Sequence, residues 1–314
     1  MISIRASSWL IAALIVVGGA IWLVAACGLR SGQIPPTSVR NSADAGATVL
    51  TVSDPAELRV DAYWEPIKDS QYDLHHKWEE LGKLRPAFQS RVYSGSDFRA
   101  FLPGKPVSVG EIWALEGDGL LTFLRQFHSG ATLRLHINNG DSLGAYACLR
   151  GVSDQYAQVV FRIHAEFVLR DGFFTPGQFT GSLVLDRASN RPVFFRMYLP
   201  PAPVNFDVGW RIAIDGHGKM TVGGTEVEVE ARHITDAGCV PRMELNSGNP
   251  EVIDGAKWLA VKSLAEVKRA LALRSYRFKN IEWVEFEDAS RLARKADKPL
   301  HVVAVDGTLD DESC

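Results

Sequence analysis

The sequence predicts an α+β protein built from three successive parts, each with its own pattern of apolar residues. An uninterrupted apolar run near the N-terminus predicts a transmembrane or signal helix. Alternation of apolar and polar residues from about 105 to 235 predicts a central antiparallel β-rich domain, folded as a sandwich or an open barrel. Apolar residues spaced by three and four after residue 255 predict a return to helix, followed by one short C-terminal strand.

The composition excludes some classes of function. Apolar residues make up 46% and charged residues 23% of the 314-residue chain, which is ordinary for a folded protein with one large or two smaller domains. A net charge of -3 gives no electrostatic footprint for nucleic acid. The four cysteines are widely spaced, without a CxxC pair or a zinc-binding pattern, so the sequence predicts no metal or other cofactor. The oligomeric state is left open.

The N-terminal apolar run covers residues 9–27, after a short basic segment at 1–8. The run carries no charge, and its 19 residues are close to the ~20 that cross a bilayer as a helix. Arg5 precedes the run, and positive charge favours retention of that end in the cytoplasm. The sequence therefore predicts a single-pass protein of the cell membrane, with the bulk of the chain extracytoplasmic, in the periplasm of a bacterium.

The end of this run has a second interpretation. The segment Leu23–Cys27 reads LVAAC and resembles the lipobox of bacterial lipoproteins, which implies a possible lipid on Cys27. A plain anchor and a lipidated cysteine give the same topology, a tethered domain in an oxidising space. Residues 28–57 are rich in Ser, Pro, Gly, Ala and Thr, and they are predicted to form a flexible linker.

The domain predicted for residues 58–250 opens with a stretch, 63–92, whose spacing suggests mainly helix. Strands follow, and the clearest covers residues 157–169. Its odd positions are apolar, whereas Arg162, His164 and Glu166 lie on the other face, which is expected to be wet. Further strands are expected over 179–185, 193–199 and 206–214, with a turn over 186–190.

Two cysteines fall inside this domain. Cys148 lies in a strand-like segment and Cys239 in a turn, and in an oxidising compartment they could form a disulfide. A buried free thiol is the alternative for Cys148.

A pair of histidines precedes a pair of glutamates at helical spacing. His75 and His76 lie four residues before Glu79 and Glu80, an arrangement that can bind zinc or pair electrostatically. The HExxH order of metalloproteases is absent.

The last part of the chain, residues 255–314, is predicted to hold two helices and a strand. The first helix is expected over 255–276 and the second over 283–296, before an Asp-Lys-Pro stop at 297–299. Residues 300–305 then read as a short buried strand.

Residues 283–314 resemble the start of a thioredoxin-like domain, in which an alanine-rich helix leads through a Lys-Pro pair into the central strand. In that family the redox cysteines follow at the start of the next helix, so the resemblance implies that Cys314 is the nucleophile or the resolving thiol. This chain has one cysteine where the family has two redox residues. Three acidic residues directly before Ser313 would also raise the thiol pKa.

Two explanations of this segment remain open. In the first, it is a degenerate appendage of the β domain. In the second, the product is longer, because bacterial thioredoxin-like selenoproteins carry a selenocysteine beside the site cysteine. That residue is encoded by a UGA codon that is easily taken for a stop, so the chain would be truncated at that codon.

The sequence therefore supports two functions from different classes. The first is a thiol or selenol oxidoreductase acting on protein thiols, with activity only in a product that extends past Cys314. The second is a non-enzymatic periplasmic binding or scaffold protein whose curved sheet holds a lipid or an apolar peptide. Its candidate ligand-binding residues are the aromatic side chains on the expected strands, Phe161, Phe167, Phe195, Phe206 and Trp210. A cavity lined by these rings would favour binding, and a filled core would count against it.

Overall fold

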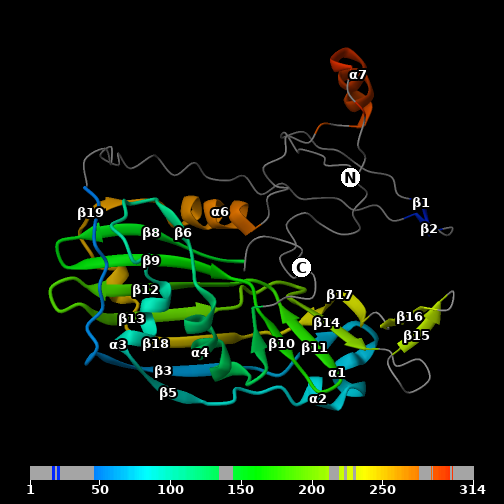
Figure 1. The fold of residues 1–314 in the computed structure, drawn as a ribbon, viewed down its shortest axis with the longest axis horizontal. Helices are drawn as coiled ribbons and strands as arrows, with labels where there is room; N and C mark the ends of the chain where they lie inside the picture. Colours follow the sequence, from blue (N-terminus) through cyan, green and yellow to red (C-terminus); the bar gives the residue numbers. More distant parts are fainter. Residues whose placement is uncertain are drawn as a thin grey trace. The chain divides into compact units, whose positions relative to one another are not determined.

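The alternating segments form two antiparallel β-sheets, one of nine strands and one of six among the residues described (Figure 1). The computed structural model describes residues 16–17, 20–21, 46–133, 144–211, 219–222, 225–228, 231–275, 284, 286–297 and 299. Both sheets and the helices α1 to α6 belong to one compact unit that includes Ser42–Asn280. The strands β1 and β2 and the helix α7 belong to a second unit.

The nine-stranded sheet contains the strands that the alternation predicted best. Its order is β19 (Trp258–Val261), β8 (Ala145–Ser153), β9 (Tyr156–Ile163), β12 (Phe179–Asp186), β13 (Arg191–Tyr198), β18 (Met243–Gly248), β3 (Glu57–Trp64) and β5 (Ser90–Ser94), with β6 (Ile112–Ala114) also paired to β8. The strands expected over 179–185 and 193–199 are confirmed as β12 and β13, and a tight turn with Asn190 at φ 53° joins them.

The six-stranded sheet continues several of the same chain segments. Its order is β4 (Asp69–Ser70), β17 (Ala231–Cys239), β14 (Phe206–Arg211), β11 (Gly172–Pro176), β10 (Glu166–Val168) and β7 (Ala131–Thr132). The single strand expected over 157–169 is therefore two strands, because β9 ends at Ile163 and β10 begins at Glu166 in the other sheet. A separate hairpin joins β15 (Lys219–Val222) to β16 (Thr225–Glu228).

The helices are short, apart from three. They are α1 (Leu74–Lys77), α2 (Glu79–Gly82), α3 (Gly95–Phe98), α4 (Gly117–Phe127), α5 (Glu251–Asp254), α6 (Leu264–Ser275) and α7 (Phe286–Ala296), with two 3₁₀ turns at Gln71–Asp73 and Arg99–Phe101. The helix expected over 283–296 is confirmed over the residues of α7.

Aromatic rings fill the space between the nine-stranded sheet and α4. Phe123 of α4 lies 5.1 Å from Phe195 of β13, and Phe101 lies 4.6 Å from Phe161 of β9, measured between ring centroids. All four side chains are fully buried. Gly181 of β12 makes room for this packing, because a Cβ there would lie 2.3 Å from the Phe161 ring. The alternation on these strands thus encodes a packed core.

The same core continues into the six-stranded sheet through Trp64, the last residue of β3. Its ring lies 5.8 Å from Phe167 of β10 and 5.6 Å from Phe174 of β11. Phe206 of β14 then contacts Phe174 at 5.0 Å. One contiguous core therefore joins both sheets.

The opposite face of the nine-stranded sheet is covered at β8 and β9 by α6. Val267 and Leu271 of α6 pack against Cys148 and Val160, and all four side chains are at most 2% exposed. The prediction that Arg162, His164 and Glu166 lie on a solvent-exposed face is therefore wrong, because these side chains are at most 6% exposed.

The predicted fold class is corrected to a mainly antiparallel β protein with few helices. Most of the helix expected over 9–27 lies outside the described residues, so that helix stays a prediction. Of residues 9–27, the structure describes four, and these form β1 (Val16–Val17) and β2 (Ala20–Ile21), an antiparallel pair. Across the described parts of the chain, no helix has the length and apolarity needed to cross a membrane.

Two predictions of helix are wrong in part. The stretch 63–92 contains the end of β3, β4, two four-residue helices and the start of β5. The stretch 255–276 begins with β19, which pairs with β8, and becomes helical only at Leu264. In both places pairing with a distant strand overrides the local helical spacing.

Candidate functional site

Cys148 lies on β8 under α6, in surroundings that suppress thiol reactivity. Its side chain is 1% exposed and contacts Val160, Val267 and Leu271. Burial raises the pKa of the Cys148 thiol to about 11. Because the thiolate is the nucleophile, Cys148 is an inert structural thiol near neutral pH. This matches the buried free thiol that the sequence offered as an alternative.

Cys239 ends β17 in the six-stranded sheet and is half-buried. Its Sγ lies 3.4 Å from the carbonyl oxygen of Ala202. Burial raises its pKa, against the opposing charge of Lys68. Cys239 is therefore also poorly suited to act as a nucleophile.

The disulfide that these cysteines could form, according to the sequence, is absent from the structure. Both thiols are free, and they lie in different sheets. Two other predicted site residues, Cys27 and Cys314, lie outside the described residues. The expected C-terminal strand over 300–305 lies outside them as well.

The His/Glu spacing is interrupted at Trp78, whose extended backbone separates α1 from α2. His75 Nδ1 lies 2.5 Å from the Ser70 hydroxyl, while Glu79 pairs with Lys83. Glu80 accepts a hydrogen bond from the backbone N–H of Arg170 at 3.0 Å. Among the residues that the structure describes, no group of three or more His, Cys, Asp or Glu side chains could hold a metal ion.

The aromatic residues proposed for an apolar ligand are largely used in packing. Phe161, Phe167, Phe195 and Phe206 are fully buried, and each contacts other rings of the core. Trp210 is partly buried at the edge of the same core. This filled core counts against a lipid site between the sheets.

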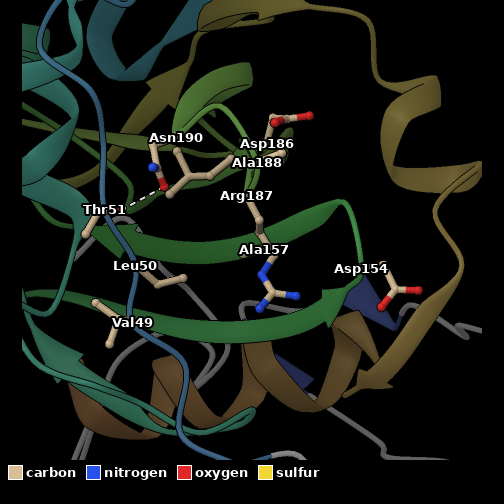
Figure 2. Close-up of a pocket in the computed structure, with 10 residues that line it drawn as sticks. Val49, Leu50, Thr51, Asp154, Ala157, Asp186, Arg187, Ala188 and Asn190 are labelled. Carbon is tan, nitrogen blue, oxygen red and sulfur yellow. Dashed lines mark hydrogen bonds between the residues drawn. The ribbon is translucent and has the colours of Figure 1, made fainter.

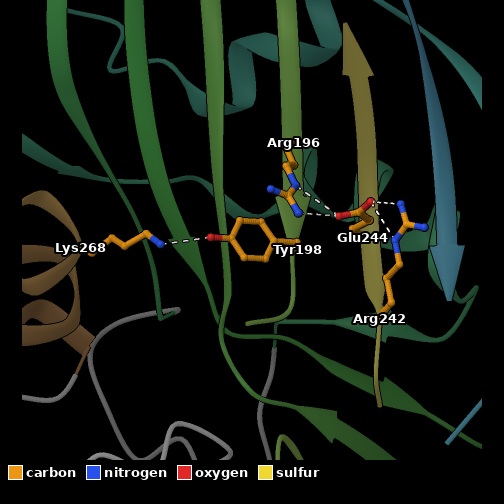
Figure 3. Close-up of polar contacts among 5 residues, drawn as sticks. All are labelled: Arg196, Tyr198, Arg242, Glu244 and Lys268. Carbon is orange, nitrogen blue, oxygen red and sulfur yellow. Dashed lines mark hydrogen bonds and ion pairs between the residues drawn. The ribbon is translucent and has the colours of Figure 1, made fainter. Parts of the chain in front are cut away.

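A polar network on the outer face of the nine-stranded sheet is the most organised charged site in the described chain (Figure 3). Its centre is Glu244 of β18, whose side chain is 6% exposed. Arg196 of β13 donates from Nε and Nη2 to Glu244 Oε2, at 3.2 and 2.9 Å. Arg242 donates from Nε to Oε1 at 3.0 Å and from Nη2 to the same oxygen. One buried carboxylate thus binds two arginines.

Strand register places a tyrosine on each side of this carboxylate. Tyr198 of β13 and Tyr63 of β3 are the direct cross-strand partners of Glu244. The Arg196 guanidinium carbon lies 4.3 Å from the Tyr198 ring centroid, and that of Arg242 lies 4.0 Å from the Tyr63 centroid. Lys268 of α6 lies 3.1 Å from the Tyr198 hydroxyl. The network therefore links α6, β13, β18 and β3.

Electrostatic interactions within this network favour the ionised forms of Glu244 and Arg242. Burial opposes ionisation of Glu244, but hydrogen bonds from Arg242 and Arg196 outweigh it and lower the pKa of Glu244. The hydrogen bond to Glu244 in turn raises the pKa of Arg242. At neutral pH the site holds one carboxylate between two guanidinium ions.

A pocket of about 370 Å³ opens beside this network, where β13 and β3 end and β18 begins. Its walls combine charged and apolar groups, namely Glu65, Arg196, Tyr198, Leu199, Pro201, Pro241, Arg242, Met243 and Glu244. The site has no local signal in the sequence, because Arg196, Glu244 and Tyr63 meet only through the pairing of strands far apart in the chain.

A second pocket, of about 300 Å³, lies between residues 49–51 and the turn that joins β12 to β13 (Figure 2). Its polar groups hold turns together. Thr51 Oγ1 donates to Asn190 Oδ1 at 2.8 Å, and Arg187 Nη1 donates to the carbonyl of Ser153 at 2.5 Å. Asp186 accepts hydrogen bonds from Ser189. Because these polar groups already bind one another, this second pocket is a weaker candidate for a functional site than the polar network around Glu244.

Comparison with known proteins finds similarity to one named group. The chain is 28% identical to Selenoprotein N of Danio rerio over 283 residues, which covers 73% of this chain and 48% of the relative. It is 27% identical to Selenoprotein N of Mus musculus with the same coverage, and 28% identical to that of Homo sapiens, where 45% of the relative is covered. This chain is homologous to Selenoprotein N. No protein-family model matches it, and no solved structure does.

The length of the aligned region shows which part of the chain resembles Selenoprotein N. The 32 residues from Trp283 to Cys314 are about a tenth of the chain, so a match over 73% must include much of the β-rich unit. The chain spans about half the length of the curated relatives it matches.

Proposed function

We propose that this chain is part of a thiol–selenol oxidoreductase similar to Selenoprotein N, with Cys314 as one of the two redox residues of that enzyme. The observation that carries the proposal is the similarity to Selenoprotein N over 73% of the chain. The name of those relatives says that they contain selenium. The resemblance of residues 283–314 to the start of a thioredoxin-like domain supports the same chemistry.

The environments of the described cysteines support assigning the chemistry to Cys314. Cys148 is buried with a pKa of about 11, and the pKa of Cys239 is raised as well. A redox thiol instead needs an exposed position and a lowered pKa. A selenocysteine beside Cys314 would supply the reactive anion, because a selenol ionises more readily than a thiol.

The proposed reaction is an exchange between the enzyme and a protein disulfide. The selenolate attacks one sulfur of the disulfide, forms a Se–S bond and expels the other sulfur as a thiolate. The Cys314 thiolate then attacks selenium, forms an intramolecular Se–S bond and releases the second substrate thiol. The substrate gains two electrons, and an external thiol reductant restores the enzyme.

The first test is to sequence the DNA after the codon for Cys314. We expect an in-frame UGA, followed by codons for a helix and the remaining strands of a thioredoxin-like sheet. A UAA or UAG codon at that position would refute the selenocysteine partner.

The second test compares thiol reactivities and activity in the complete product, expressed with selenocysteine insertion. Iodoacetamide should label the selenocysteine and Cys314 under native conditions, and Cys148 only after denaturation. Reduction of a disulfide substrate by dithiothreitol should be lost in Cys314→Ser and retained in the matched variant Cys148→Ala. Equal activity of the two variants would contradict the role of Cys314.

The extracytoplasmic location expected from the sequence stays a prediction. The alternative function, binding of a lipid or apolar peptide by the sheet, is weakened by the filled aromatic core.

A further inference from the structure

The pocket beside Glu244 contains charged groups that the network does not use. Each guanidinium has five N–H donors, and Arg196 and Arg242 each reach Glu244 through Nε and Nη2. Within the described residues, neither Nη1 group makes a hydrogen bond. Both side chains remain about half accessible, at 45% and 44% exposure. The two arginines can therefore donate to a further anionic group.

A carboxylate of this chain, Glu65, also lines the pocket. Glu65 follows β3 and is exposed, and its side chain makes no hydrogen bond or ion pair within the described residues. Its charge contributes to the raised pKa of Arg242, after the larger effect of Glu244, which indicates that the two groups are near each other. Glu65 can therefore pair with a cation.

The charges decide the kind of ligand. Glu244 neutralises one of the two guanidinium charges, so the arginines retain one net positive charge, and Glu65 adds one negative charge. A simple anion would be repelled by Glu65, and a simple cation would be repelled by the arginines. A group that carries a carboxylate and an ammonium matches both.

We propose that this pocket binds the zwitterionic group of a free α-amino acid, with its carboxylate on Arg196 and Arg242 and its ammonium on Glu65. The volume of about 370 Å³ lies within the range of small-molecule sites. Leu199, Pro201 and Pro241 supply apolar wall for a side chain. The proposal is independent of the redox function.

Contacts with the protein hold both arginines in position without a ligand, which favours binding. Each guanidinium lies over a tyrosine ring and is hydrogen-bonded to the same buried carboxylate. Lys268 contacts the Tyr198 hydroxyl and fixes that ring as well. Little side-chain entropy is therefore lost on binding.

The test is a titration of the full chain, labelled with ¹⁵N arginine, with glycine, leucine, glutamate and cysteine under reducing conditions. We expect at least one free amino acid to shift the Nε–Hε signals of Arg196 and Arg242 saturably. The N-acetyl and amide forms of that amino acid should bind at least tenfold more weakly, because each lacks one charge. Shifts no larger than those produced by potassium chloride, or equal affinity for the three forms, would overturn the proposal.

Single substitutions test the ammonium-binding and the carboxylate-binding groups of the pocket separately. Glu65→Gln changes an exposed side chain that makes no hydrogen bond or ion pair with any described residue, and it should reduce the preference for the free amino acid over its N-acetyl form at least fivefold. Arg196→Lys keeps the charge but loses the planar fork, and it should weaken all carboxylate ligands. The control Arg59→Ala removes an exposed arginine of β3 outside the pocket and should bind as the parent does. An unchanged preference in Glu65→Gln would refute the role of Glu65.

Discussion

The two faces of the nine-stranded sheet are stabilised by different physical means. On the inner face, Phe161 and Phe195 pack among other rings at centroid distances of 4.6 to 5.8 Å, and no single contact dominates. On the outer face, Arg196 and Arg242 make directional contacts to one carboxylate, Glu244, and Arg242 also lies over Tyr63 of β3. The inner face should therefore respond to lost volume, and the outer face to lost charge and to pH.

The largest effect is expected from Phe195→Ala on the inner face. Removing this fully buried ring should lower the free energy of unfolding by about 3–5 kcal/mol, because both apolar burial and packing are lost. Urea denaturation followed by tryptophan fluorescence measures the change. The control Val92→Ala, at a 56% exposed position of β5, should change stability by less than ~0.5 kcal/mol. A loss below ~1 kcal/mol for Phe195→Ala would show that the core is loosely packed.

A smaller effect is expected from Glu244→Gln on the outer face. The amide keeps the shape but leaves two guanidinium groups without their counter-charge, so the free energy of unfolding should fall by about 1–3 kcal/mol. Asp61→Asn is a suitable control, because the side chain of Asp61 forms an exposed ion pair with Arg59 at 3.7 Å that should contribute little to stability. Equal effects of the two variants would mean that Glu244 acts only as a surface charge.

The contribution of Glu244 should also depend on pH. Its pKa in the folded state lies below the ordinary glutamate value of 4.5, since the hydrogen bonds from the arginines outweigh burial. The stabilisation is therefore fully present above pH 4.5 and is lost as the pH falls through the lower pKa of the folded state. The stability difference between the parent and Glu244→Gln should shrink between pH 6 and pH 3 in urea denaturation. A difference that stays constant over this range would contradict the ion-pair account.

The smallest effect is expected from Lys268→Met on α6. This change removes the contact of 3.1 Å with the Tyr198 hydroxyl and keeps the apolar stem, so the loss should be about 0.5–1 kcal/mol. The same denaturation assay measures it. A loss above ~2 kcal/mol would show that this contact is essential for attaching α6 to the sheet.

The two faces also differ in how well the sequence predicts them. Alternation is a local property, so β12 and β13 and their buried rings could be predicted from neighbouring residues alone. The outer network depends on the pairing of Glu244 with Tyr198 and Tyr63, and register between distant strands has no local signal. For the same reason the helical spacing over 63–92 and 255–263 was misleading, because distant strand partners decide both segments.

The position of β3 has a consequence for how the protein is made. Asp61 of β3 pairs with Ser90 of β5 on one side and with Asn246 of β18 on the other. During synthesis at roughly 5–20 residues per second, β5 emerges within seconds, but β18 follows only after on the order of ten seconds or more. For that interval the open edge of β3 is available to other chains. A ribosome-associated chaperone that covers this edge until residue 248 has emerged should therefore increase the yield of folded protein.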